Sequence, residues 1–258
     1  MVIYLTTKSN SVKRIHLMDE IRGFAVFCMV FYHAFYSMGF LFSIDVGTKL
    51  LNVFMVFEPF FAGAFILISG ISSQLSHSNV KRGLMLVGVS ILITGVTFWF
   101  IREQLILFGI LHLLSVCILL FAGLKKLLQK VPVLLGLTIN VFMFVLTLNV
   151  EGGVIGLGNI WSVSIPKVLF SYPALYPFGI YHIKTYCSDY FPLLPWMFVF
   201  FFGAFLGRYA LKGMFPKFMY KSRAPFFSWL GTHALPIYIF HQPIIYVLLA
   251  AGKCIFNN

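Results

Sequence analysis

Residues 23–42 read GFAVFCMVFYHAFYSMGFLF, twenty residues with one His and no Asp, Glu, Lys or Arg. A bilayer core about 30 Å thick needs about 20 apolar residues in a helix. The stretch therefore predicts the greater part of a transmembrane helix over 17–42. Six further runs of this kind follow, at 50–73, 83–101, 105–124, 131–150, 190–211 and 225–251. The fold class they predict is an all-α, polytopic membrane helix bundle with about seven transmembrane helices.

The composition excludes the common soluble classes. Of the 258 residues, 60% are hydrophobic and only 10% are charged, against about 25% charged in an ordinary soluble domain. Basic residues come in small groups between long apolar runs, which argues against nucleic-acid binding. The four Cys form neither a CxxC motif nor a metal-binding spacing. We expect one transmembrane domain over 1–258, with no metal.

Positive charge orients the chain. With the N-terminus in the cytoplasm, 14 of the 19 Lys and Arg fall in cytoplasmic segments, accompanied by only two of the seven acids, Asp19 and Glu20. This predicts a multi-pass protein of the cell membrane, with a cytoplasmic face able to attract anionic lipid or a polyanionic ligand. The Gly- and Pro-rich stretch 152–188 becomes a long outer loop between helices five and six. The sequence leaves open whether Cys187 and Cys254 pair, and whether the chain forms a homodimer.

Four helices each place one ionisable side chain at a similar depth. His33, Glu58, His112 and His241 are all expected about 3–10 Å to the outer side of the membrane centre, at 1.5 Å of rise per residue. One such His is commonly a packed core residue. Four at one depth predict a polar cavity, because ionisable groups inside a membrane are costly and usually functional. Gln242 adjoins His241 in this layer.

The first helix links this layer to the cytoplasm. Arg22 and His33 are eleven positions apart, which puts them on one helix face and about 16 Å apart along the axis. Asp19 lies one turn before Arg22 and can pair with it. Arg22 alone could equally be a snorkelling anchor. The motif SGISS at 69–73 permits either close helix packing or close backbone approach to a ligand.

Five blocks resemble, in order, the heparan-alpha-glucosaminide N-acetyltransferase catalytic-domain family, within the wider group of transmembrane acyltransferases. The resemblance covers most of the chain apart from the fifth helix and much of the outer loop. Its blocks are RIHLMDEIRGFAVFCMVFYHAFY (14–36), FAGAFILISGISSQLS (61–76), FGILHLLSV (108–116), DYFPLLPWMFVFFFGAFLGR (189–208) and WLGTHALPIYIFHQPII (229–245).

The resemblance implies transfer of an acetyl or other acyl group from cytosolic acetyl-CoA to an extracytoplasmic, sugar-type hydroxyl or amine. His33 would be the general base or a transiently acylated nucleophile. Segment 34–49 lacks the His that lysosomal relatives carry after the first helix, so the role falls to His33 and the acceptor stays open. The remaining candidates are Glu58 and His241 as catalytic partners; Arg22, Asp19, Ser69, Gly70 and Ser72 for CoA; and His112, Asp189 and Gln242 for the glycan-like acceptor.

Two other classes remain open. A small-solute transporter or channel would use the same polar cavity for passage, without an acyl product. A haem-b electron-transfer protein would use two of His33, His112 and His241 as axial ligands.

Overall fold

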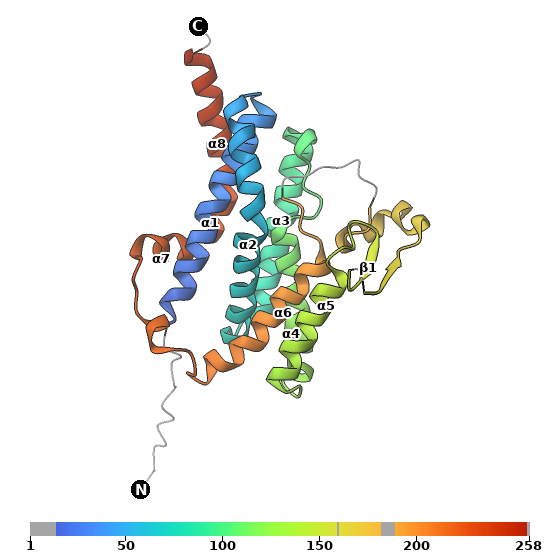
Figure 1. Ribbon diagram of the computed structural model, residues 1–258. Helices are drawn as coiled ribbons and strands as arrows, with labels where there is room; N and C mark the ends of the chain where they lie inside the picture. Colours follow the sequence, from blue (N-terminus) through green and yellow to red (C-terminus); the bar gives the residue numbers. More distant parts are fainter. Residues whose placement is uncertain (1–13, 159, 182–188, 257–258) are drawn as a thin grey trace.

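The computed structural model describes residues 14–158, 160–181 and 189–256 of the chain. Helices dominate, and they run in alternating directions along a common bundle (Figure 1). The longer ones are α1 (His16–Tyr36), continued by the π-helical turn η1 (Ser37–Leu41), α2 (Asp45–Leu75), α3 (Asn79–Phe100), α4 (Ile110–Leu128), α5 (Val133–Thr147), α6 (Leu193–Leu211), α7 (Pro225–Thr232) and α8 (Ala234–Phe256).

Six of these helices are long and apolar enough to cross a bilayer: α1 with η1, α2, α3, α4, α6 and most of α8. The shorter α5 is also apolar. Large hydrophobic side chains such as Phe60, Trp99 and Leu134 point outward and are more than 70% exposed. An outer surface of this kind suits hydrocarbon rather than water. The predicted all-α, polytopic membrane bundle is thus confirmed.

Two of the predicted runs fold differently from expectation. The apolar run 225–251 is two helices, because the chain leaves helical geometry at His233 between α7 and α8. The run 131–150 yields only the 15 residues of α5, because Pro132 precedes its first turn and the chain turns after Thr147. The short α7 packs along α1 near the end where α1 begins.

A carboxylate of α1 holds the beginning of α7. The buried side chain of Glu20 accepts hydrogen bonds from Ser222 Oγ at 3.1 Å and from the backbone N–H groups of Arg223 at 2.6 Å and Ala224 at 2.9 Å. These donors precede the first turn of α7, where helix N–H groups lack partners within the helix. Glu20 therefore fixes α7 against the helix that carries Arg22 and His33.

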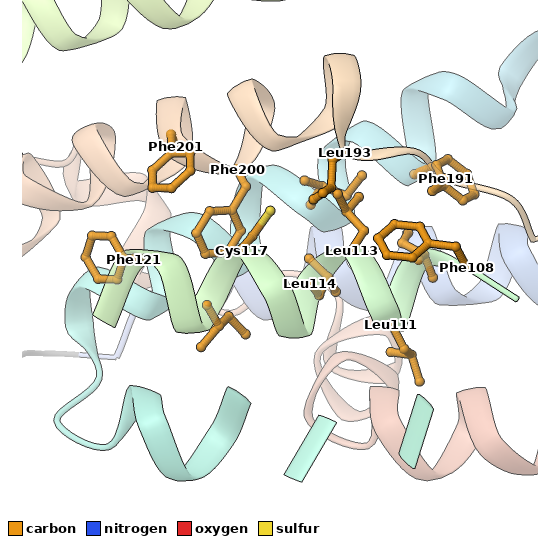
Figure 2. Close-up of a cluster of buried hydrophobic side chains, with 14 of the residues drawn as sticks. Phe108, Leu111, Leu113, Leu114, Cys117, Phe121, Phe191, Leu193, Phe200 and Phe201 are labelled. Atoms are coloured by element: carbon orange, nitrogen blue, oxygen red, sulfur yellow. The ribbon is translucent and has the colours of Figure 1, made fainter. Parts of the chain in front are cut away.

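The main hydrophobic core lies between α4, α6 and α2 (Figure 2). Leu113, Cys117 and Phe121 of α4 interleave with Leu193 and Phe200 of α6. All five are buried, and α4 and α6 are the best enclosed of the membrane-spanning helices. This packing fixes the start of α4, which contacts two of the candidate site residues described below.

Glycine allows α2 and α6 to cross closely. A Cβ at Gly70 would collide with the carbonyl of Phe200, and one at Gly203 with the carbonyl of Leu67. Gly203 therefore has a helix-contact role. Gly70 lies at the same crossing, so its own place is in packing.

Basic residues gather at one end of the bundle. The beginnings of α1 and α3 and the ends of α2, α4 and α6 lie together at the lower end of Figure 1, whereas η1 and the end of α8 lie at the upper end. Lys81, Lys126, Arg208 and Lys217 belong to this lower end, called the basic end below. This arrangement agrees with the charge-based prediction of the cytoplasmic side.

The Gly- and Pro-rich stretch after α5 holds no long helix in its described part. It forms a small antiparallel pair, β1 (Val154–Gly156) with β2 (Ser162–Ser164), and the short turns η3 (Lys167–Ser171) and η4 (Pro173–Phe178). The proposed partner of Cys254, Cys187, lies outside the described residues. Cys254 itself is exposed.

Candidate active site

A large cavity opens at the basic end of the bundle. Its volume is about 510 Å³, and α1, α2, α3, α4 and α8 all contribute to its lining. Three guanidinium groups line it, from Arg14, Arg22 and Arg82, whereas Asp19 is the one carboxylate among its lining residues. The deeper wall is apolar, with Phe65, Leu86, Leu111, Leu114 and Leu235. This basic cavity therefore suits a ligand with an anionic end and a less polar arm.

Two contacts fix the guanidinium group of Arg22. Its Nη1 lies 3.1 Å from Asp19 Oδ1, and its Nη2 donates to Ser72 Oγ at 2.7 Å. Asp19 is shared, because Arg14 Nε contacts its other oxygen at 2.9 Å. Arg22 therefore lies oriented in the cavity wall instead of snorkelling away from the bundle. Ser69 lines the same cavity beside Ser72.

A second cavity, of about 320 Å³, lies farther toward the upper end, between α1, η1, α3 and α8. Most of its lining is aliphatic or aromatic. Its polar side chains include His33, Asp189, Tyr238, His241 and Gln242. Gln242 is held by Ser37, whose Oγ donates to Gln242 Oε1 at 3.4 Å. We call this space the upper cavity.

A thin partition separates the two cavities. Tyr238 lines both of them, and a central pocket of about 30 Å³ lies between, lined by His33, Glu58, Asp189 and Tyr238 among others. That volume is roughly the share of one water molecule in the liquid. His33 and Asp189 line the central pocket and the upper cavity alike. Ligands bound in the two cavities would therefore approach each other at this partition.

Asp189 and Tyr238 hold the partition together. The Tyr238 hydroxyl donates a hydrogen bond to Asp189 Oδ2, and the carboxyl also accepts from the backbone N–H of Ile110, in the first turn of α4. Asp189 precedes α6 in the chain and is only 4% exposed. Burial raises the pKa of the Asp189 carboxyl to about 7, although both hydrogen bonds oppose the rise.

Two buried imidazoles face each other beside this partition. The ring centroids of His33 and His241 are 4.9 Å apart with the planes tilted by 52°. His241 Nδ1 lies 2.7 Å from the carbonyl oxygen of Tyr238. A carbonyl only accepts, so Nδ1 carries the proton and Nε2 offers its lone pair. Among the described residues, neither His241 Nε2 nor His33 Nδ1 has a hydrogen-bond partner.

Unpartnered buried nitrogens of this kind are costly unless a ligand or water satisfies them. Both belong to residues that line the upper cavity, so a molecule bound there lies beside both imidazole rings. Glu58 joins them from α2, with its carboxyl hydrogen-bonded to Tyr32 of α1. His33 thus has Glu58 beside it in the central pocket and His241 beside it in the upper cavity.

His112 is placed differently from the other candidates. Gly109 N–H donates to its Nδ1 at 3.1 Å, so its Nε2 carries the proton and lies 3.1 Å from Thr94 Oγ1. Both nitrogens are therefore occupied in joining α3 to the start of α4. His112 lines neither of the two large cavities nor the central pocket. His112 lies at the depth expected from the sequence, but the rotation of α4 about its axis directs the side chain toward α3.

Sequence reasoning missed two residues of the site. Tyr238 lies three positions before His241 and thus on the same helix face, a signal that was available. Arg82 enters the sequence argument only as one of the 14 cytoplasmic Lys and Arg. Its presence in the basic cavity depends on how α3 packs beside α1 and α2, for which the sequence carries no clear signal.

The contact between the His33 and His241 rings bears on the haem alternative. Axial ligands of a haem lie on opposite faces of the macrocycle, but these two rings touch and leave no slot between them for a porphyrin plane. Because His112 is turned away toward Thr94, it forms no second pair with either ring.

A comparison with protein families assigns the chain to one of them. The family model described as "Heparan-alpha-glucosaminide N-acetyltransferase, catalytic" matches residues 14–243, which is most of the chain and contains every candidate site residue. No curated protein and no solved structure matches it.

Proposed function

Since the chain belongs to the heparan-alpha-glucosaminide N-acetyltransferase catalytic family, a membrane acetyltransferase-like family, we propose that it moves an acetyl group across the membrane. The donor is acetyl-CoA bound from the cytoplasm, and the acceptor is a hydroxyl or amine on the other side of the cell membrane. The observation that carries the proposal is the pair of cavities that share Tyr238 as a wall, with a central pocket lined by His33 and Asp189 between them.

The basic cavity is the donor site in this proposal. CoA carries phosphates at one end and a long, thin pantetheine arm at the other. Arg14, Arg22 and Arg82 supply charge-assisted hydrogen bonds to the phosphates. The apolar wall receives the arm, which must span about 16 Å from Arg22 to the level of His33. The thioester carbonyl then lies at the partition.

His33 is the general base that takes the proton of the acceptor, or the nucleophile that is acylated first. The acceptor attacks the thioester carbonyl, the carbon–sulfur bond breaks, and the leaving sulfur takes up a proton. His241, with its free Nε2, and Glu58 orient His33 and the acceptor group. Gln242 and Asp189 supply further polar contacts in the upper cavity.

The test separates the two ends of α1 by binding and turnover. Arg22→Ala removes a charge-assisted bond worth roughly 1.5–3 kcal/mol, so CoA should bind about 10- to 150-fold more weakly. Most of that loss should appear in KM, because the phosphates are remote from the reacting carbonyl. His33→Ala should leave CoA binding nearly unchanged and lower turnover by about 10²–10⁴.

Two matched variants serve as controls. Lys126→Ala removes an exposed charge at the same basic end, and His77→Ala removes an exposed imidazole. Calorimetry of CoA binding and single-turnover transfer from radiolabelled acetyl-CoA would measure all four. Wild-type transfer rates in His33→Ala would overturn the mechanism. Solute flux in proteoliposomes without any acetylated product would support a transporter instead.

A further inference from the structure

The upper cavity has two chemically distinct parts. Its inner end is lined by His33 and His241, each of which has one ring nitrogen without a hydrogen-bond partner among the described residues. Its remaining wall is mostly aliphatic or aromatic, with Leu92 and Val96 of α3 facing the cavity together with Phe240 and Tyr246 of α8. A small sugar or amine fills only the inner end, which leaves the apolar part without a role.

The apolar part opens toward the hydrocarbon. Leu92 is 58% exposed, Val96 45%, Phe240 59% and Tyr246 47%, so these residues mark where the cavity reaches the surface. All four lie within membrane-spanning helices, Asn79–Phe100 and Ala234–Cys254, and none lies in a loop. The mouth between α3 and α8 is therefore lateral, toward lipid.

The side toward water is covered by chain. Ile101, Gln104 and Ile106, from the connection between α3 and α4, line the upper cavity and are only partly exposed. The Gln104 side-chain oxygen is buried there, without a hydrogen-bond partner among the described residues. A polar head group that reached the inner end would pass beneath this cover and could donate to that oxygen.

We propose that the acceptor is an amphiphile of the bilayer, a lipid-anchored sugar or amine, which enters the upper cavity sideways between α3 and α8. This inference rests on the proposed function and names its acceptor class. The head group lies at the inner end, with its hydroxyl or amine toward His33. The tail passes through the apolar mouth and stays in hydrocarbon, so it loses little contact with lipid. A free polar acceptor would have to desolvate at that mouth.

The first experiment measures binding without catalysis. Full-length protein in nanodiscs is photolabelled with dodecyl glucosaminide that carries a diazirine in its alkyl chain, and labelled peptides are mapped by mass spectrometry. We expect labelling in 92–106 and 237–246, competed by unlabelled dodecyl glucosaminide and not by methyl glucosaminide. Labelling spread evenly over the lipid-facing helices, without competition, would overturn the inference.

A matched pair of variants tests the mouth. Leu92→Trp narrows it, whereas Leu135→Trp places the same side chain on the outward face of α5, away from the cavities. We expect Leu92→Trp to reduce labelling at least about tenfold, a change of about 1.4 kcal/mol, and Leu135→Trp to have no effect. CoA binding should be unchanged in both. Equal labelling of both variants would contradict lateral access.

Transfer assays distinguish the inference from the proposed function. With radiolabelled acetyl-CoA, octyl and dodecyl glucosaminides should be acetylated at least about tenfold faster than methyl glucosaminide, and only Leu92→Trp should remove this advantage. Partitioning into the membrane alone would raise the rates of both variants equally. Equal rates for methyl and dodecyl acceptors would overturn the lipid acceptor and leave the transferase intact. Specific labelling without any acetyl-CoA binding would overturn the transferase and leave the amphiphile site intact.

Discussion

At the scale of single residues, the candidate site depends on which ring nitrogens have no hydrogen-bond partner within the protein. His112 and His241 have nearly the same depth, yet His112 uses both ring nitrogens in structural contacts and His241 keeps one free. The sequence could predict depth, because helix rise and bilayer thickness are fixed. It could not predict rotation about the helix axis, which depends on packing with neighbours that are distant in sequence.

The buried carboxyl of Asp189 should make the stability of the protein depend on pH. Its pKa is about 7 in the folded protein against 3.8 for the ordinary carboxyl, so the folded state binds more protons between these values. Stability contributed by the protonated carboxyl is therefore present at low pH and is lost as pH rises through 7. Asp189→Asn, which is always neutral, should flatten this dependence. Melting temperatures in detergent at pH 5 and pH 8 would test it.

We expect the wild type to lose roughly 3–10 °C of melting temperature between these two pH values, and Asp189→Asn to lose much less. Asp45→Asn, at the start of α2 and away from both cavities, serves as the control and should behave like the wild type. An Asp189→Asn protein as pH-sensitive as the wild type would show that this carboxyl is not responsible.

At the scale of elements, hydropathy located the membrane helices, but it did not show that α5 is short or that the chain breaks between α7 and α8. From Pro225 to Ala251 the chain is apolar almost throughout, so nothing in the composition marks the break at His233. Pro236 does not mark the break either, because it lies in the first turn of α8, where proline is tolerated. At its other end, α7 is held by Glu20 of α1.

The crossing of α2 and α6 gives a prediction for stability. Gly70→Ala would place a methyl group against the backbone carbonyl of Phe200, so one helix must move. We expect a loss of about 1–3 kcal/mol, typical of overpacking. Gly88→Ala on α3 meets nothing within 4 Å and should be neutral or slightly stabilising, because alanine favours helices.

Unfolding titrations of both variants in mixed micelles would compare the two free energies. Because Gly70 lies next to Ser69, which lines the basic cavity, Gly70→Ala should also weaken CoA binding if the crossing shapes that cavity. Equal stability of the two variants would show that the crossing tolerates a wider separation than the structure has.

At the scale of the whole molecule, the orientation predicted from charge agrees with the gathering of basic residues at one end. A single accessible Cys at exposed position 217 or 167, in a background where Cys28, Cys187 and Cys254 are replaced by Ser, would test it in intact cells. An impermeant maleimide should label position 167 at once and position 217 only after permeabilisation. The reverse pattern would place the basic cavity outside, where acetyl-CoA is absent, and would exclude the proposed donor side.

The partition shared by the two cavities has an electrical consequence. An acyl group that leaves the thioester for an outer acceptor formally carries one positive charge outward. If His33 returns the acceptor proton to the leaving sulfur, one positive charge also moves inward through the same partition, and the cycle is electroneutral. If each side instead exchanged its proton with its own solution, every turnover would move one charge against an inside-negative potential, at about 2.3 kcal/mol per 100 mV. We therefore expect supported-membrane recordings during acetylation to show no current, and turnover to be the same at 0 and −100 mV. A current proportional to product would mean that the proton leaves by another route, and that the cell's membrane potential opposes this reaction.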